Sequence, residues 1–224
     1  MSEKRLLITE DGSHTIYLPE IKETYHSTHG AIRESEHVFI RHGLKYAQQQ
    51  GKKNIKVFEL GFGTGLNALL SWIYAVRNQI SINYHTIEAY PLTREDTEVL
   101  NYTSLIDAAN ATDKFDKIHQ CAWNEVVGLS PCFQLQKIEQ LMQGFRTDMQ
   151  FDVCYFDAFA PSKQAEMWEI AVLEKVNNLL VPQGVLVTYC AKGQLKRDLK
   201  SLGFEVESLP GPPGKKEMVR AVKR

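Results

Sequence analysis

The sequence predicts an α/β fold built on a mostly parallel sheet. Three observations support this: apolar, β-rich segments alternate with helical segments from Asn54 to about Gly203, a glycine-rich loop joins the first such segment to a helix, and two strand-like segments follow one another at the end of the chain. Alternation of strands and helices is typical of parallel sheets, because each parallel connection needs a crossover. The two final segments predict an antiparallel pair at one edge.

Length and composition are those of one globular domain. The chain has 224 residues, of which 43% are hydrophobic and 24% are charged, so it is long enough to bury a core. Its net charge of −1 excludes a wholly basic nucleic-acid-binding protein but leaves room for a local basic face. No apolar run approaches the roughly 18–20 residues of a membrane span, and the charged start does not resemble a signal peptide. We therefore expect a cytoplasmic protein that does not enter the membrane.

The cysteines and histidines predict neither disulfides nor a metal site. The four cysteines are widely spaced and form no CxxC pair, and Cys154 and Cys190 lie in apolar segments, as buried thiols do. His26 and His29 have a spacing that suits a metal on a helix, but no Asp or Cys nearby completes the set. We expect a reducing compartment and no bound metal.

Residues 1–50 are predicted to form an extension that packs on a domain made of residues 51–224. The extension is expected to begin with a hairpin, because a turn signal separates two short apolar segments. A helical pattern of apolar residues follows. The predicted elements are strands at 6–9 and 15–18, the turn Asp11-Gly12 between them, and a helix from about 27 to 49.

The domain starts with an unbroken apolar strand at 55–60, as expected for a parallel strand covered on both faces. Thr93 is predicted to cap a helix, because charged residues fill the turn after it. The region 103–130 is expected to contain helix and loop. The other predicted strands lie at 81–90, 132–138, 151–159, 184–190, 204–209 and 217–222, the helices at 66–76, 93–100, 164–179 and 195–203, and a turn at 181–184.

The glycine-rich loop after the first strand is the sharpest sign of a ligand site. Glycines there let a ligand approach the backbone, and the following helix offers free N–H groups. Nicotinamide and flavin sites read GxGxxG, whereas this loop reads GxGxG, and the carboxylate of Glu59 would stand near a diphosphate. S-adenosylmethionine, which carries a sulfonium, an ammonium and a ribose but no phosphate, suits this loop better. The predicted contacts are Glu59, Gly61, Phe62, Gly63, Thr64, Gly65 and Asn67.

Two acidic residues at strand ends extend the predicted site. Glu88 ends the second strand 23 residues after Gly65, and an acidic residue near this spacing commonly binds ribose hydroxyls. Asp157 ends a strongly apolar strand, and ligands of open α/β sheets bind beyond the carboxyl ends of strands. We expect Asp157 beside the glycine loop, in contact with the methionyl ammonium or with a substrate amine. Phe159 belongs to a partly aromatic lip that suits stacking of a base.

The chain resembles the methyltransferase domain of the bifunctional enzyme that modifies the wobble uridine of tRNA, a family that also has stand-alone members. The resemblance covers nearly the whole chain, and its most specific part combines GFGTGLN (61–67), DAFAP (157–161) and EMW (166–168). It implies a class I S-adenosylmethionine-dependent methyltransferase fold, Rossmann-like, with a mostly parallel seven-stranded sheet. It also implies methylation of the 5-aminomethyl group of a wobble uridine, often 2-thiolated, to give 5-methylaminomethyl-uridine.

The same resemblance implies roles for individual residues. Asp157 would lie at the reaction centre, while Tyr25 and His26 would help to close the pocket. The substrate would be tRNA, and a separate protein would supply the aminomethyl precursor. Ala158 departs from the family, which often has glycine there. If the substrate is tRNA, phosphates would contact some of the basic residues Lys192, Lys196, Arg197, Lys215 and Lys216, for which a solvated face is the alternative.

Three other functions compete with this interpretation. A nucleotide-cofactor oxidoreductase is disfavoured by the missing GxGxxG and by Glu59. A non-catalytic binding module is disfavoured by the presence of Asp157 beside an intact glycine loop. A methyltransferase of another small amine stays open, because the overall charge is not basic.

Overall fold

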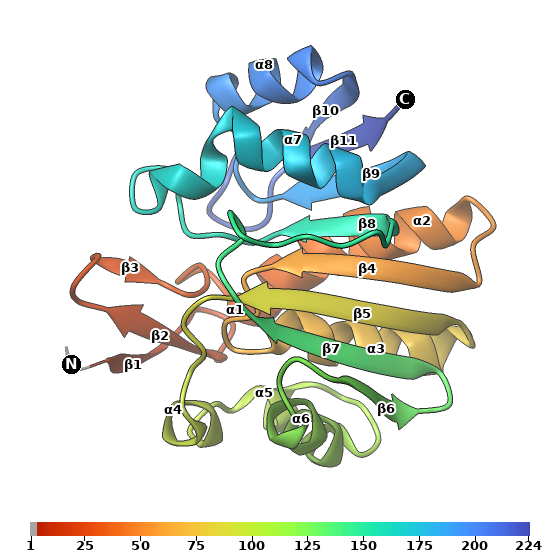
Figure 1. Cartoon of the computed structure of the whole chain (residues 1–224). Helices are drawn as coiled ribbons and strands as arrows, with labels where there is room; N and C mark the ends of the chain where they lie inside the picture. Colours follow the sequence, from red (N-terminus) through yellow and green to blue (C-terminus); the bar gives the residue numbers. More distant parts are fainter. Residues whose placement is uncertain (1–3) are drawn as a thin grey trace.

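The structure is a computed structural model that describes residues 4–224 (Figure 1). Its centre is an eight-stranded sheet with the order β10-β11-β9-β8-β4-β5-β7-β6, and a separate three-stranded sheet has the order β1-β2-β3. The central strands are β4 (Asn54–Leu60), β5 (Ser81–Glu88), β6 (Val126–Ser130), β7 (Phe133–Glu139), β8 (Phe151–Phe156), β9 (Leu180–Thr188), β10 (Phe204–Pro210) and β11 (Glu217–Lys223).

The strand directions confirm the predicted α/β architecture. Strands β9, β8, β4, β5 and β7 are parallel neighbours, while β11 runs antiparallel to both β9 and β10. The antiparallel pair predicted for the end of the chain therefore forms one edge of the sheet. Parallel strands point their carboxyl ends to the same side, and the ends of β4 and β5 point toward β1–β3 in Figure 1.

Two expectations about the strands were wrong. The sheet has one strand more than the seven expected, because β6 lies within the region 103–130 and pairs antiparallel with β7. Short alternating segments at a sheet edge carry a weak pattern, since only one side of such a strand is paired. The turn expected at 181–184 lies inside β9, where the pairing with β8 is interrupted and Gln183 has a left-handed φ of 64°.

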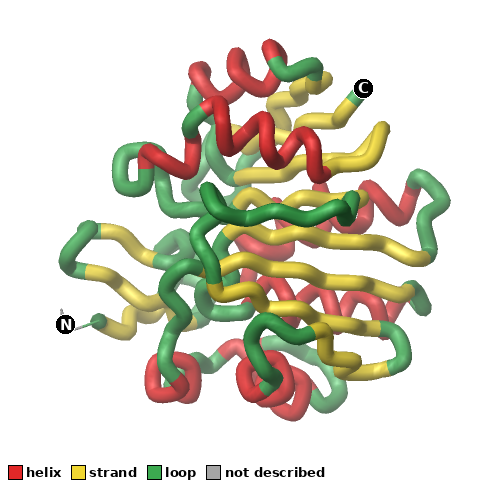
Figure 2. The backbone as a smooth tube through the Cα atoms, in the orientation of Figure 1, coloured by secondary structure: helices red, strands yellow, loops and turns green. Residues whose placement is uncertain are grey.

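Helices cover the sheet (Figure 2). Their bounds follow the predicted ranges closely. One continuous helical segment runs through α1 (Ala31–Ser35), the π-helical η1 (Glu36–Leu44) and α2 (Lys45–Gln49). Thr93 caps its helix as predicted: its hydroxyl accepts from the Asp96 N–H at 3.3 Å. The other helices are α3 (Leu66–Asn78), α4 (Arg94–Glu98), α5 (Tyr102–Leu105), α6 (Ala111–Gln120), the 3₁₀ turn η2 (Ala165–Trp168), α7 (Ile170–Leu179) and α8 (Gly193–Ser201).

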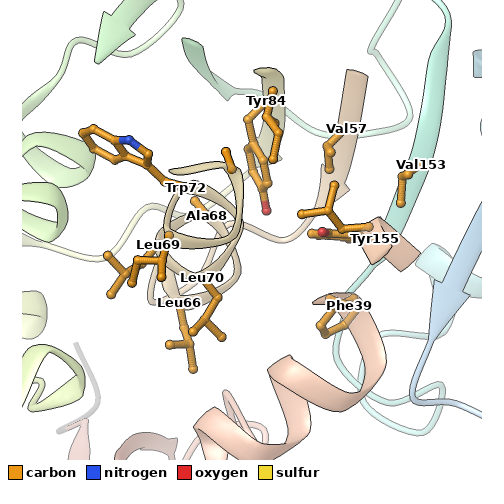
Figure 3. Close-up of a cluster of buried hydrophobic side chains, with 14 of the residues drawn as sticks. Phe39, Val57, Leu66, Ala68, Leu69, Leu70, Trp72, Tyr84, Val153 and Tyr155 are labelled. Atoms are coloured by element: carbon orange, nitrogen blue, oxygen red, sulfur yellow. The ribbon is translucent and has the colours of Figure 1, made fainter. Parts of the chain in front are cut away.

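The core has two parts because side chains alternate between the two faces of the parallel strands. On one face, Val153 and Tyr155 of β8 pack with Val57, with α3 and with Phe39 of η1 (Figure 3). On the other face, Cys154 and its neighbours pack against α7. The predicted buried thiols Cys154 and Cys190 are 1% and 5% exposed, and all four cysteines are free.

The N-terminal part forms the predicted hairpin and adds a third strand. β1 (Arg5–Ile8) and β2 (His14–Leu18) are antiparallel, and the short β3 (Glu23–Thr24) pairs with β2. Asn101 ties the hairpin to the domain, because its amide donates to the Gly12 carbonyl at 2.9 Å and accepts from the His14 N–H at 2.8 Å. The helix of this part shares the core with the sheet. The division of the chain near residue 50 stays a prediction, and residues 1–3 lie outside the described residues.

Two surface hollows lie away from the glycine loop. One, of about 280 Å³, is lined by residues that include His85, Gln136 and Arg146. The other, of about 670 Å³, lies where strands begin, beside Asn54 and Ser81. No residue of the glycine loop 61–67 lines either hollow, so both are separate from the candidate site at the carboxyl ends of the strands.

Close packing of the helical segment on the sheet predicts one stability effect. A methyl group on Gly43 would lie 2.9 Å from Val187 Cγ2 and 3.1 Å from Tyr155 Cε1. Gly43→Val should lower the free energy of unfolding by about 1–3 kcal/mol, because added volume overpacks the contact. Gly128→Val is the control, since a methyl group there would meet no atom within 4 Å. Urea unfolding measures both variants, and equal effects would contradict this account of the contact.

Candidate functional site

The loop between β4 and α3 passes unusually close to the segment that follows β8. Gly61 has φ 89°, and a methyl group on it would lie only 2.6 Å from the Asp157 carbonyl oxygen. The Asp157 N–H in turn donates to the Leu60 carbonyl at 3.0 Å. Glycine is therefore required at position 61 for both conformation and space. This contact places Asp157 beside the loop, where the sequence analysis expected it.

One side-chain amide joins two carboxylates at this point. Asn67, in the first turn of α3, donates from Nδ2 to Glu59 Oε1 at 3.0 Å and to Asp157 Oδ2 at 2.8 Å. Asn67 is 3% exposed and Glu59 is fully buried. The amide has two N–H groups, so each carboxylate can accept one of them. Asn67 thereby fixes the spacing of the two acids at the start of the helix.

Burial changes the acidity of both carboxylates. It raises the pKa of Glu59 to about 8, with Asp157 adding to the increase and a hydrogen bond from Thr86 opposing it. Burial also raises the pKa of Asp157 to about 7, with a further increase from Glu34 and decreases from Asn67 and Lys215. At neutral pH Glu59 thus holds a proton, while Asp157 exchanges one readily. A carboxyl group that titrates near neutral pH is suited to proton transfer.

Glu88 lies at the end of β5, next to β4, and holds the loop in place. One of its oxygens accepts from the Gly63 N–H at 3.1 Å and the other from the Tyr90 N–H at 2.9 Å. Glu139 ends the neighbouring strand β7 in register with Glu88. Two acidic residues therefore stand at adjacent strand ends on the side of the loop away from Asp157.

The N-terminal part covers the loop with Tyr25 and His26. The Tyr25 ring packs so closely on Gly63 that a methyl group there would lie 2.9 Å from Tyr25 Cδ1. Tyr25 also meets Phe159 edge to face, with 5.2 Å between ring centres. His26 Nε2 is hydrogen-bonded to Thr64 Oγ1 at 2.7 Å, and burial lowers the pKa of His26 to about 4, so it is neutral. The structure thus brings Tyr25, His26 and Phe159 to the glycine loop.

Behind the loop lies a cluster that the sequence analysis missed. His119 donates to the Thr64 carbonyl at 3.2 Å, and its ring packs against Phe62 and Gly65. The buried Lys137 donates to the His119 carbonyl at 2.9 Å. His119 lies in the region whose pattern was hardest to interpret, and Lys137 occupies an inward position of β7 where a charged residue is not expected.

The five basic residues predicted to contact tRNA have different environments. Lys192, Arg197 and Lys216 are exposed. Lys196 is paired with Glu217 at 2.6 Å. Lys215 turns inward and is paired with the buried Glu34 at 2.5 Å. Lys192, Arg197 and Lys216 are therefore the basic residues that are best placed to contact phosphates. Lys215 instead lies near Asp157.

Glu34 is a further residue of the site that sequence reasoning left out of it. It lies on α1, and its carboxylate is buried between the Lys215 ammonium and the Ser27 N–H, the latter at 2.8 Å. A buried carboxylate on a short helix has no distinctive sequence pattern. Only the position of the loop 211–216 in space shows that Glu34 faces the end of β8.

Residues 4–224 contain no group of three or more His, Cys, Asp and Glu side chains arranged to hold a metal. His26 and His29 have different partners, since His26 is hydrogen-bonded to Thr64 and His29 to Glu10.

Among the helices of the described part of the chain, none has the length and apolar character needed to cross a membrane.

Comparisons with known proteins agree with this geometry. Residues 133–224 match the family of S-adenosyl-L-methionine-dependent methyltransferases. The whole chain also aligns with the crystal structure of MNMC2 from Aquifex aeolicus. The TM-score is 0.81 and the sequence identity 22%, and the alignment covers 100% of this chain and 71% of that one. The fold is that of a class I S-adenosylmethionine-dependent methyltransferase.

Two similar proteins carry the same name. The tRNA 5-methylaminomethyl-2-thiouridine biosynthesis bifunctional protein MnmC of Burkholderia thailandensis is 31% identical, in an alignment that covers 96% of this chain and 34% of that protein. The protein of the same name from Cupriavidus necator is 33% identical, in an alignment that covers 92% of this chain and 32% of that protein. The chain thus spans about a third of the length of these relatives.

The residues at the carboxyl ends of β4, β5 and β8 fit S-adenosylmethionine, the cofactor of this fold. Glu88, at the end of β5, would hold the ribose hydroxyls of such a ligand. The space beside Gly61 and Gly63 is taken by the Asp157 carbonyl and by the Tyr25 ring. Asn67 Oδ1 is buried without a hydrogen-bond partner. Buried polar atoms normally have partners, so this unused acceptor beside the loop matches a ligand that carries N–H and O–H donors.

The raised pKa of Glu59 predicts a pH-dependent stability. The folded state holds this proton more tightly than the unfolded chain, so the stabilisation is present at low pH and is lost as pH rises toward about 8. Between pH 5 and pH 9 the wild type should lose at least about 1 kcal/mol of unfolding free energy relative to Glu59→Gln, which does not titrate. Urea unfolding at both pH values measures this difference, and parallel curves would show that Glu59 titrates normally.

Proposed function

We propose that this chain is an S-adenosylmethionine-dependent N-methyltransferase that acts on tRNA in the cytoplasm. The substrate would be 5-aminomethyl-uridine, with or without 2-thiolation, at the wobble position, and the product 5-methylaminomethyl-uridine. The observation that carries the proposal is the alignment of 96% of the chain with a protein named for 5-methylaminomethyl-2-thiouridine biosynthesis. We also propose that a separate protein supplies the aminomethyl precursor, as the resemblance to the family implies.

The residues of the site have chemistry that suits an amine substrate. S-adenosylmethionine, when bound, supplies a methyl group on a positively charged sulfur. A free alkylamine is mostly protonated at pH 7, so the substrate must lose a proton before it acts as a nucleophile. Asp157 can accept that proton because its pKa is raised to about 7, and its bond from Asn67 fixes its position. Tyr25 and Phe159 offer aromatic faces beside it for a base.

A methyltransferase of another small amine is the second candidate. It is supported by the near-neutral net charge of −1 and by the pairing of Lys196 and Lys215 with acidic residues. The two candidates share the same cofactor and the same use of Asp157. They differ in whether exposed basic residues contact the substrate.

Nucleoside analysis of tRNA from cells that lack this protein tests the proposed substrate. Aminomethyl-uridine species should accumulate, and the methylaminomethyl form should fall correspondingly. Re-expression of the wild-type chain should restore the methylated nucleoside, whereas Asp157→Asn should not. Unchanged wobble nucleosides in the deletion strain would refute the substrate and favour the small-amine candidate.

Asp157→Asn should slow the chemical step without disturbing tRNA binding. The substitution keeps size and the bond from Asn67 but removes the proton acceptor. Single-turnover methyl transfer at saturating S-adenosylmethionine should fall at least about tenfold, a barrier change of about 1.4 kcal/mol. Saturation removes any contribution from weaker cofactor binding. A normal saturated rate would exclude Asp157 from the reaction centre.

The exposed basic residues should act on affinity alone. Lys192→Ala with Arg197→Ala should weaken tRNA binding and flatten its salt dependence by up to about one unit of slope for each lost phosphate contact. The saturated rate should be nearly preserved, because neither residue contacts the loop. Glu205→Gln is the matched surface control. An unchanged salt slope in the double variant would show that this charge is only solvated.

A further inference from the structure

Glu34 of the N-terminal part and Lys215 of the loop 211–216 form one partly buried ion pair near the end of β8. Lys215 donates from Nζ to Glu34 Oε1 at 2.5 Å, and the side chains of the two residues are 30% and 8% exposed. The other Glu34 oxygen accepts from the Ser27 N–H at 2.8 Å. Both oxygens of this carboxylate are thus engaged, so its position is fixed from two sides.

The same lysine is held against the segment that carries Asp157. Its ammonium lies 3.7 Å from the centre of the Tyr189 ring, a cation–π contact. The Tyr189 hydroxyl donates to the carbonyl of Ala158, the residue after Asp157, at 2.8 Å. The ion pair and the end of β8 are therefore parts of one connected structure.

The loop that carries Lys215 is seated on the N-terminal part and does not extend freely from the surface. Gly214 has φ 81° and packs on His29 so closely that a methyl group would lie 1.9 Å from His29 Cδ2. Just before this loop, the Pro210 carbonyl accepts from His37 Nε2 at 2.8 Å. These contacts keep the Lys215 ammonium at Glu34.

We propose that the Glu34–Lys215 ion pair is a positioning pair that controls how strongly Asp157 accepts a proton from the substrate amine. The proposal rests on the proposed function, because it concerns the proton that an amine must lose. In this step an N–H bond of the substrate ammonium breaks and an O–H bond forms on Asp157, whose proton later passes to water. Glu34 and Lys215 act on the step through their charges and do not touch the reacting atoms.

The two members of the pair have opposite electrostatic effects. The carboxylate of Glu34 raises the pKa of Asp157, and the ammonium of Lys215 lowers it. A negative neighbour favours the protonated, neutral carboxyl, while a positive neighbour favours the ionised form. A merely structural ion pair would not predict opposite effects from the loss of its two members.

Glu34 and Lys215 also act on other titratable groups near Asp157. Burial lowers the pKa of His26 to about 4, with an increase from Glu34 and a decrease from Lys215, so His26 stays neutral. Burial raises the pKa of Tyr84 and of Tyr189 above the usual value of a tyrosine, and Glu34 adds to the increase for Tyr189. The main influences on Glu59 are burial, Thr86, Asp157, Asn67 and Tyr84. Of the two carboxyls that titrate near neutral pH, Asp157 is therefore the one that responds directly to changes at positions 34 and 215. The charged and titratable groups around Asp157 and the pair are Glu59, Tyr84, Tyr189, His26, Glu34 and Lys215.

The direct test measures the Asp157 carboxyl without substrate or cofactor. The protein is labelled with ¹³C at the aspartate carboxyl carbon, the Asp157 signal is assigned by its loss in Asp157→Asn, and its midpoint is followed with pH. Glu34→Gln should lower the midpoint and Lys215→Met should raise it, each by roughly half a unit to one unit. Glu207→Gln, which breaks the Glu207–Arg220 pair at 2.6 Å, is the control and should leave the midpoint unchanged.

The titration decides the proposal in either direction. Opposite shifts in the two variants support it, while shifts in the same direction, or none in both, overturn it. Circular dichroism establishes that each variant folds, and Lys215→Gln or Glu34→Ala replaces a variant that does not. Lys215→Arg and Glu34→Asp keep the charges, so they are the matched controls and should leave the midpoint close to that of the wild type.

The pH dependence of methyl transfer provides a second test of the proposal. If the proposed function holds, the acid limb of the saturated rate should move in the same direction as the NMR midpoint for each variant. Absence of any transfer by the wild-type protein would reject the proposed function but leave the titration result standing. If the NMR midpoint of Asp157 shifts but the acid limb of the rate profile does not move, the ion pair does not control proton transfer in the reaction, and the proposal is overturned.

Discussion

The amide of Asn67 is the interaction on which the rest of the site depends. It donates to two carboxylates at once, one at the end of the first central strand and one beyond β8. Two acids so close repel each other when both are ionised, and burial adds to that cost. The site meets this constraint by keeping Glu59 protonated and by leaving Asp157 close to its titration midpoint. A single neutral amide thereby joins the protonated Glu59 to Asp157, the acid that we propose takes part in the reaction.

This arrangement requires the glycine at position 61 and the parallel order of the strands. β8 is the neighbour of β4 although β5, β6 and β7 lie between them in sequence, and Gly61 lets the segment after β8 come within contact distance of the loop. The N-terminal part then covers the loop with Tyr25 and His26, and the loop 211–216 adds Lys215. Segments from the beginning, middle and end of the chain thus converge on one carboxylate.

Much of the fold was predictable from sequence because the signals were local. Buried parallel strands are apolar runs, Thr93 has a capping pattern, and the glycine loop sits between a strand and a helix. The edge strand β6 was missed because all its residues are exposed or half-buried, so it carries no clear apolar pattern. In the site, residues at strand ends were predictable from topology. Glu34 and the inward turn of Lys215 were not, because they depend on contacts between distant segments.

The central claim is that this site methylates the amine of a wobble uridine. It is tested most directly by incubating the purified chain with labelled S-adenosylmethionine and two preparations of one tRNA, one with 5-aminomethyl-uridine and one with 5-methylaminomethyl-uridine at the wobble position. The account predicts one labelled methyl per aminomethyl-tRNA, recovered as 5-methylaminomethyl-uridine after digestion, and none in the second tRNA. Label in another nucleoside, or equal label in both tRNAs, would contradict it.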